Sequence, residues 1–272
     1  MSALPGSAAA GASPGGAVTA PLRVVKIGGR VQSQPRLAGA LADAWRRAPG
    51  ALVVVHGGGD EVTALQRRLG TEPTFVGGRR VTREEDVELL RMALSGVANK
   101  RLVSALTREG VEAVGVSGED ASLLVAEPGD LAALGRVGQV RRVNVRFLWD
   151  LLDGGFLPVL SPLATALDGS GALNVNGDDA AAAVAAALDA DELLLVADVP
   201  GVLVGGEPAG ALDAEAARAA VARGEASGGM AAKLDAALAA LAQGVPQVRI
   251  GDLAALADAA RGTVVTTSRS TR

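Results

Sequence analysis

Apolar residues follow two different periods along the chain, and the two periods alternate. Residues 22–27 and 51–55 are short runs rich in valine, leucine and isoleucine that end close to glycine, which predicts buried strands. Between them, residues 34–47 carry Leu37, Leu41 and Trp45 at helical spacing. The segment therefore predicts two strands joined by a helix, a connection typical of parallel pairing.

The same alternation continues as far as residue 266. In chain order the sequence predicts helices over 61–69 and 83–108, a strand over 111–116, a helix over 147–152, a strand over 157–161, a hairpin over 164–175, a helix over 178–188, a strand over 192–197, helices over 214–223 (capped by Asp213) and 230–243, a strand over 247–250, a helix over 254–260 and a strand over 263–266. Strands separated by helices form parallel sheets that are covered on both faces. The predicted fold class is therefore α/β, a three-layer α/β/α sandwich around a mainly parallel sheet.

Composition excludes several classes of chemistry. The 272 residues include no cysteine and one histidine, which excludes disulfides, thiolate catalysis, iron–sulfur clusters and a histidine-based metal cluster. A formal charge of −4, spread over interspersed acids and bases, argues against a nucleic-acid partner. The longest apolar run, residues 180–188, is too short to span a bilayer. Residues 1–21 are rich in Ala, Gly, Ser and Pro, so we expect a disordered tail, no secretory signal and a cytoplasmic protein.

Lysine is rare in this chain, and two of the three lysines lie beside glycines. The sequence has 23 arginines but only Lys26, Lys100 and Lys233 as lysines, which suggests that lysine is kept where a compact ammonium is needed. Lys26 is followed at once by Ile27, Gly28 and Gly29, where backbone N–H groups can approach a phosphate. Lys233 is predicted in the first turn of a helix, which favours an anionic partner there. The alternative is three ordinary surface lysines.

Other strand ends also carry candidate ligand groups, because ligands of open parallel sheets lie at the carboxyl ends of the strands. His56 precedes Gly57, Gly58 and Gly59, and we interpret it as a packed residue that anchors the loop, not as a base. The remaining candidates are Arg79 and Arg80 in a turn, Asn174 and Asn176 before Asp178, the segment 198–201 and the segment 227–233. Each alone could be an ordinary turn or a solvated basic segment. Together, without a base or a metal cage, they favour phosphoryl transfer, in which catalysis is mostly positioning and charge neutralisation.

Several of these motifs occur in one order that is specific. They are VVKIGG at 24–29, VVVHGGG at 53–59, GRRVT at 78–82, GVANK at 96–100, GVSG at 115–118, NVNGDDAAAAVAAAL at 174–188, LLLVADVPGVL at 193–203 and GGMAAKLDAAL at 228–238. With these motifs the sequence resembles the amino acid kinase family over about residues 23–266. The resemblance implies ATP-dependent phosphorylation of the γ-carboxylate of N-acetyl-L-glutamate in arginine biosynthesis, with Mg²⁺ held mainly by the nucleotide phosphates.

The resemblance also implies a role for each motif residue. Lys26 and Lys233 would neutralise the transferred phosphoryl group, and Asp178 would orient the two lysines. Substrate would contact Gly58, Gly59, Arg80, which grips the α-carboxylate, and Asn174, which meets the acetylamino group; phosphate would contact Gly28 and Gly29; nucleotide would contact Asp198, Gly201, Gly229 and Met230. By the same likeness, residues 22–190 form a lobe for acyl-amino-acid binding and dimerisation, and residues 191–272 form a nucleotide-binding lobe.

Three residues depart from the family pattern. Ala197 stands where Ser or Thr is usual, Gly177 replaces a commoner Ala, and Arg79 adds a second arginine beside the expected carboxylate clamp. The tail lacks the amphipathic helix of hexameric, arginine-inhibited members, so we expect a homodimer insensitive to arginine. Alternative functions are a kinase for carrier-protein-linked aminoadipate in lysine biosynthesis, a glutamate or aspartate kinase, and a non-catalytic binding protein on the same fold.

Overall fold

A computed structural model of the protein describes residues 20–76 and 78–267. The expected disordered tail, residues 1–21, lies outside the described residues except for Ala20 and Pro21. Of the helices in the described part of the chain, none has the length and apolarity that a bilayer crossing demands.

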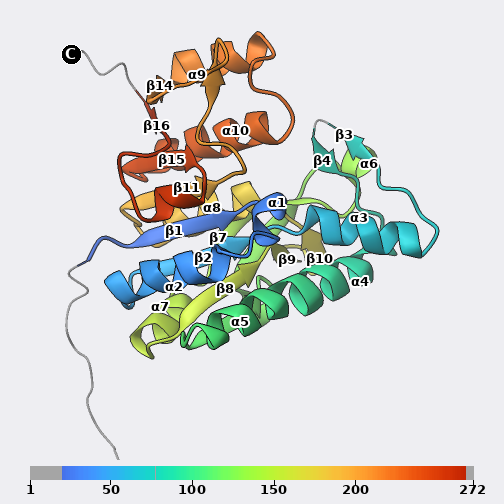
Figure 1. Ribbon diagram of the computed structural model, residues 1–272. Coiled ribbons are helices and arrows are strands. Elements are labelled where there is room, and N and C mark those ends of the chain that lie inside the picture. The colour runs from blue at the N-terminus through green and yellow to red at the C-terminus, as the bar shows by residue number, and fades with distance from the viewer. Residues whose placement is uncertain (1–19, 77, 268–272) are drawn as a thin grey trace, which may run out of the picture.

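An eight-stranded sheet forms the centre of the molecule (Figure 1). Its strands, in spatial order, are β14 (Ala211–Asp213), β16 (Thr263–Thr266), β15 (Gln247–Gly251), β11 (Glu192–Val196), β1 (Arg23–Ile27), β2 (Leu52–His56), β8 (Leu157–Ser161) and β5 (Ala113–Ser117). Every neighbouring pair is parallel except β15 with β16. The predicted mainly parallel sheet is therefore confirmed.

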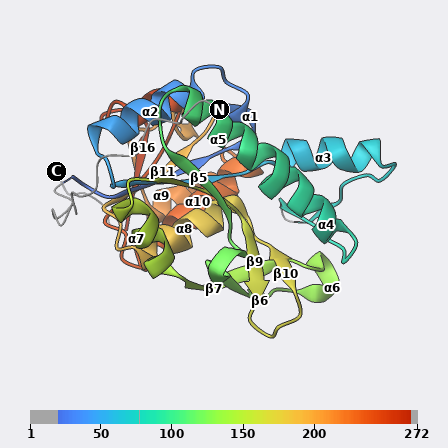
Figure 2. The same cartoon turned by 90° about the horizontal axis from the view of Figure 1, so that it is seen from below.

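Helices cover both faces of this sheet, which confirms the predicted three layers (Figure 2). On one face lie α8 (Gly177–Ala187) and α10 (Gly229–Ala242); on the other lie α2 (Leu37–Arg47) and α5 (Asn99–Arg108). The inner strands are apolar on both sides because both sides are covered, and all five residues of β2 and of β11 are buried. The strand β11 of the second expected lobe pairs directly with β1 of the first, so one sheet runs through both lobes.

A second, four-stranded sheet lies against the outer side of α8. It consists of β10 (Ala172–Asn174), β9 (Leu163–Ala166), β6 (Leu124–Pro128) and β7 (Gly138–Val143). The hairpin predicted over 164–175 is β9 and β10, whereas β6 and β7 were not predicted. Helix α8 contacts β7 on one side and β1 on the other, which explains why alanine occupies nearly all of its faces.

Shorter elements connect the two sheets and the site described below. They are α1 (Gly29–Gln32), α3 (Gly59–Arg68), β3 (Phe75–Val76), β4 (Arg79–Arg80), the short 3₁₀ segment η2 (Asp120–Ser122), α6 (Leu131–Leu134), α7 (Val145–Asp153), β12 (Leu203–Val204), β13 (Glu207–Pro208) and α9 (Ala214–Ala222). Asp213 caps α9 as expected, since its Oδ1 accepts from the Ala216 N–H at 2.7 Å.

Two predicted helices differ in detail. The long helix expected over 83–108 consists of α4 (Asp86–Leu90), a π-helical segment η1 (Arg91–Ala98) and then α5. In η1 each turn holds about one more residue than an α-helical turn. The helix expected over 254–260 is a short 3₁₀ segment, η3 (Leu253–Leu256), capped by Asp252. Residues 257–262 instead form turns whose carbonyls accept from a buried arginine.

That arginine, Arg249 in β15, belongs to a buried ion network at the amino end of the central sheet. It is 1% exposed and donates to Glu192 Oε1 at 2.6 Å and to the carbonyls of Ala255, Asp258 and Arg261. The other Glu192 oxygen accepts from Arg23 at 2.7 Å. The network thus fixes the C-terminal turns to β1, β11 and β15.

We predict that Arg249→Leu lowers the free energy of unfolding by about 3–5 kcal/mol, because it removes one partner of a buried ion pair and the donors of three carbonyls. Urea denaturation measures the change. The matched control is Arg218→Leu at an exposed position of α9, for which we expect a change below about 0.5 kcal/mol. Equal stability of the two variants would contradict the role given to the network.

Candidate active site

The sequence motifs meet at the carboxyl edge of the central sheet. Strands β1, β2 and β11 end there at Ile27, His56 and Val196, and each is followed by a motif segment. Helices α1, α3, α8 and α10 start at the same edge, so their N-terminal N–H groups lie near these strand ends. The fold therefore gathers segments that lie up to two hundred residues apart in the sequence.

At the centre of this edge, one carboxylate holds two ammonium groups. Asp178 Oδ1 lies 3.0 Å from Lys26 Nζ and 3.1 Å from Lys233 Nζ, and Oδ2 lies 3.2 Å from Lys233 Nζ. The exposed fractions of Lys26, Asp178 and Lys233 are only 6%, 4% and 8%. Two buried positive charges share one negative charge, so the cluster carries a net positive charge that suits an anion.

Lys233 reaches this cluster differently from the sequence prediction. Helix α10 begins at Gly229, so Lys233 is its fifth residue and lies in the second turn, not in the first. Side chains of a helix lean toward its N-terminus, which brings the ammonium back to the level of the first turn. The first-turn placement was therefore wrong.

Burial and charge shift the protonation of the cluster. Burial lowers the pKa of Lys233 to about 8, and the nearby charge of Lys26 acts in the same direction, while Asp178 opposes both. For Asp178, burial alone would raise the pKa, but the two lysines together outweigh it and lower the pKa below its usual range. Asp178 is thus a permanent carboxylate that orients cations, not a group that takes up protons near neutral pH.

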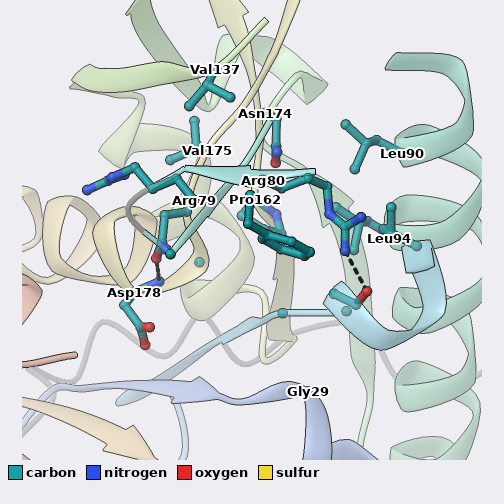
Figure 3. Close-up of a pocket in the computed structure, with 18 of the residues that line it drawn as sticks. Gly29, Arg79, Arg80, Leu90, Leu94, Val137, Pro162, Asn174, Val175 and Asp178 are labelled. Atoms are coloured by element: carbon teal, nitrogen blue, oxygen red, sulfur yellow. Dashed lines mark hydrogen bonds between the residues drawn. The ribbon is translucent and has the colours of Figure 1, made fainter. Parts of the chain in front are cut away.

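A first cavity, of about 210 Å³, opens on the Lys26 side of the cluster. Figure 3 shows Arg80, Asn174 and Asp178 around this hollow, with Gly29 beside it. Its remaining lining includes Gly58 and Gly59, the aromatic ring of Phe75 and the apolar side chains Val62, Leu90, Leu94, Val137, Pro162 and Val175. All four residues expected to bind substrate therefore line one cavity.

The two arginines of the β4 turn have different partners. Arg79 Nη1 donates to Asp179 Oδ2 at 2.5 Å, so its charge is already compensated. Arg80 donates to neutral oxygens, namely Gln66 Oε1, the Gly59 carbonyl and Thr63 Oγ1, and its guanidinium lies over the Phe75 ring. Burial lowers the pKa of Arg80. Within the described residues no carboxylate pairs with Arg80, which leaves it the better partner for an anionic ligand.

The two asparagines before α8 have separate tasks. Asn176 Oδ1 caps α8 by accepting from the Asp178 and Asp179 N–H groups at 2.8 and 3.4 Å. Asn174 Nδ2 donates to Thr82 Oγ1 at 2.9 Å, and Asn174 and Asn176 both line the first cavity. Gly177 lies between Asn176 and Asp178, where a Cβ would come 3.2 Å from Lys26 Cε, so this glycine leaves room for the lysine to reach Asp178.

A second cavity, of about 440 Å³, opens on the Lys233 side of the cluster. Gly28, Gly29, Asp198, Gly229 and Met230 line it as expected, together with Lys233, with Val199 and Ser227 from the two candidate segments and with Ala197. Arg30 and Val31, which were not predicted, complete the lining. Arg30 donates to Asp198 at 2.9 Å and, by this hydrogen bond, lowers the pKa of that carboxyl. No sequence pattern marks Arg30, because an arginine three residues after a strand is common in a chain with this many arginines.

Gly201 stands apart from the other expected nucleotide residues. It is buried, and a Cβ there would lie 2.6 Å from Thr263 Oγ1, the hydroxyl that accepts from the Val202 N–H. Gly201 is not among the residues that line the second cavity. The predicted contact of Gly201 with the nucleotide stays a prediction.

Gly29 lines both cavities, so the two meet beside the lysine–aspartate cluster. Within the described residues, no group of three or more acidic or histidine side chains could form a metal cage. The donors that surround the second cavity are backbone N–H groups, an ammonium and a guanidinium, which suit a polyphosphate. The geometry fits an anionic donor on one side of the cluster and a small acid on the other.

The sequence profile of the amino acid kinase family matches residues 21–252. The chain belongs to the amino acid kinase family. Acetylglutamate kinase of Chloroflexus aurantiacus is 44% identical over 239 residues, covering 87% of this chain and 94% of the relative. Acetylglutamate kinase of Methanopyrus kandleri is 41% identical over 255 residues, covering 90% of this chain and all of the relative.

Solved structures agree with this family membership. Protein smu.665 of Streptococcus mutans UA159 superposes with a TM-score of 0.82 at 30% identity, covering 91% of this chain and 99% of that one. N-acetylglutamate synthase of Neisseria gonorrhoeae, complexed with coenzyme A and N-acetyl-glutamate, gives 0.76 at 25% identity over 91% of this chain and 60% of that one. Carbamate kinase of Giardia lamblia shares the fold, with a TM-score of 0.68 at 15% identity.

We predict that the affinity for ATP falls by about tenfold or more as the pH rises from 7 to 9.5, because Lys233, with its pKa of about 8, loses its charge in that range. Calorimetric titration across this range measures the effect. In Lys233→Arg the guanidinium stays protonated, so the affinity should vary much less with pH. A wild-type affinity that is constant from pH 7 to 9.5 would contradict the assignment.

Proposed function

We propose that this member of the amino acid kinase family transfers the γ-phosphoryl group of ATP to the γ-carboxylate of N-acetyl-L-glutamate, the second step of arginine biosynthesis. The products are ADP and N-acetylglutamyl 5-phosphate. One observation carries the proposal: Asp178 joins Lys26 of the first cavity to Lys233 of the second, where the two cavities meet. The acetylglutamate kinases found as relatives over nearly the whole chain support the choice of substrate.

The acceptor carboxylate is already ionised, so the reaction needs no general base. An oxygen of the carboxylate attacks the γ-phosphorus from the first cavity, and the bond to the β-phosphoryl oxygen breaks on the side of the second. The ammonium groups of Lys26 and Lys233 compensate the negative charge on the transferred group and on the leaving oxygen. Gly29 lines both cavities and Gly28 lines the second, so their backbone can approach the phosphates.

The lining of the first cavity fits an acylated amino dicarboxylate. Arg80, which donates to neutral oxygens in the described part of the chain, would bind the α-carboxylate, and Asn174 would hydrogen-bond the acetylamino group. Apolar side chains such as Leu94 and Val175 surround the remaining space and would accept the methylene chain and the acetyl methyl. Gly58 and Gly59 would give backbone contacts to the same ligand.

ATP would occupy the second cavity, with its phosphates toward Gly29 and Lys233 and contacts from Asp198, Gly229 and Met230. Mg²⁺, held mainly by the nucleotide phosphates, would supply further positive charge to the β- and γ-phosphoryl oxygens. Because the protein side of this cavity offers N–H donors and cations, its own residues bind the phosphates directly.

The assembly belongs to the same proposal. Met92 and Val97 of η1 are 53% and 51% exposed, large apolar side chains on the long helix that a second copy would cover. We therefore propose a homodimer that is insensitive to arginine. Light scattering with and without arginine tests this, and a hexamer or strong inhibition by arginine would overturn it. The cytoplasmic location expected from the sequence stays a prediction.

The deciding assay traps the acyl phosphate with hydroxylamine in the presence of ATP and Mg²⁺. N-acetylglutamate, N-acetylaminoadipate and free glutamate are compared as acceptors. We expect a clear preference for N-acetylglutamate. Product from none of the three, with intact ATP binding, would overturn the proposal and favour a carrier-protein-linked aminoadipate or a non-catalytic role.

We predict that Arg80→Gln raises the KM for N-acetylglutamate by about 10- to 100-fold, since a charged hydrogen bond to the substrate is lost. Arg79→Gln is the matched variant one residue away, and because Arg79 is paired with Asp179 we expect its KM to change less than about threefold. Steady-state kinetics with saturating ATP measure both. The reverse order of effects would assign the carboxylate clamp to Arg79.

A further inference from the structure

The third lysine lies outside both cavities, yet its contacts lead to the glycine loop of the first. Lys100 Nζ donates to the Gly115 carbonyl at 2.7 Å and to Asn99 Oδ1 at 3.1 Å. Asn99 is fully buried, and its Nδ2 donates to the Val159 carbonyl at 2.8 Å and lies 3.1 Å from His56 Nε2. These side chains therefore link the carboxyl halves of β5, β8 and β2 in one continuous row.

Only one arrangement of hydrogens satisfies this row. An ammonium can only donate, so the Asn99 oxygen must face Lys100, and the amide nitrogen must face the Val159 carbonyl and His56. That nitrogen can only donate, so His56 Nε2 accepts and carries no proton. The proton of the neutral ring is then on Nδ1, which donates to the Gly57 carbonyl at 2.6 Å.

The Gly57 carbonyl in turn fixes the direction of the next N–H. In a planar trans peptide the C=O and the following N–H point in opposite directions. Because the Gly57 oxygen points to His56, the Gly58 N–H points away from the ring, and Gly57 and Gly58 both line the first cavity. Among the described residues, the Gly58 N–H has no hydrogen-bond acceptor. The row therefore leaves a backbone donor free beside the substrate site.

We propose that Asn99 and Lys100 are positioning residues for phosphoryl transfer, which hold His56 in its Nδ1–H form and thereby aim the Gly58 N–H at the reacting carboxyl group. The inference rests on the proposed function of the first cavity. In this proposal His56 does not contact the substrate; it orients the Gly57–Gly58 peptide, whose N–H meets the carboxyl group.

Two features of the fold make room for this row of side chains and orient it. The π-helical segment Arg91–Ala98 ends immediately before Asn99, and its wider turns set which side chains of the long helix face β2 and β8. Within it, Ser95 Oγ lies 2.7 Å from Ser161 Oγ at the end of β8. Gly115 is required in β5, since a Cβ there would lie 2.0 Å from Asn99 Oδ1.

The surroundings of the ring keep it neutral. Burial lowers the pKa of His56 to about 4, and the charges of Lys26 and Lys100 act in the same direction, while the hydrogen bond to the Gly57 carbonyl opposes them. The row thus stays in one state through neutral pH. A ring that gained a second proton would turn Nε2 into a donor toward the Asn99 amide nitrogen and break the row.

The single histidine of the chain makes the hydrogen assignment measurable. Nitrogen-15 NMR of the imidazole, on protein prepared without a histidine tag, distinguishes the Nδ1–H form from the Nε2–H form and from the imidazolium. We expect the Nδ1–H form in the wild type from pH 5.5 to 8. An Nε2–H ring in the wild type would overturn the proposal.

Two variants of the row then test its effect on catalysis. Asn99→Asp keeps the size of the side chain but places an acceptor opposite Nε2, so we expect an Nε2–H or doubly protonated ring and a kcat lowered by about 10- to 100-fold. Lys100→Met removes the ammonium that donates to Asn99 Oδ1. Lys100 is exposed, so we expect the variant to fold, and we expect a kcat lowered by about three- to tenfold. The KM for ATP should change less than twofold in both.

Arg108→Met is the matched control, since it removes an exposed cation from the same helix, α5. The Arg108 Nη1 group donates to Ser104 Oγ on that helix. It should leave the kcat and the imidazole signals unchanged. Normal kcat in both row variants, with normal wild-type turnover, would overturn the positioning role alone. A wild type that forms no acyl phosphate would instead overturn the proposed function and with it this role.

Discussion

The site depends on the single carboxylate that is shared by two buried ammonium groups. Lys26 comes from β1 and Lys233 from α10, and without Asp178 their charges would repel each other in a poorly solvated space. One negative charge between two positive charges holds the lysines in place and still leaves the cluster positive. The same contact therefore stabilises the local structure and prepares it for the negative charge of a phosphoryl group.

Helix α8 makes this contact possible because it lies between the two sheets. Its alanines allow close approach to β1 on one side and β7 on the other, and the Asn176 cap fixes where the helix starts. The position of Asp178 beside the two lysines is thus fixed, while Asn174, just before the helix, lines the first cavity. One short segment, residues 174–178, therefore positions groups for both the substrate side and the nucleotide side of the site.

Much of the fold followed from local pattern, and the exceptions have physical causes. The largely apolar strands β1, β2, β8 and β11 were predictable because burial on both faces leaves a run of several consecutive apolar residues. Strand β7 was missed, since it is half exposed and carries Arg141 and Arg142. The π-helical segment was missed because one extra residue in a turn changes no amino-acid preference and depends on packing against distant elements, here α3 and β5.

The sequence by itself determined the layered α/β architecture, the glycine loops at the strand ends and the two lysines and acid of the cluster. It did so because the alternation of strand and helix patterns, the glycines at strand ends and the scarcity of lysine can all be recognised without knowing which distant segments meet. Only the tertiary structure decided that Arg79 pairs with a carboxylate whereas Arg80, among the described residues, donates to neutral oxygens. It also decided that the third lysine reaches the glycine loop through Asn99 and His56. Those choices depend on partners from distant segments, whose distances and hydrogen bonds exist only after the chain has folded.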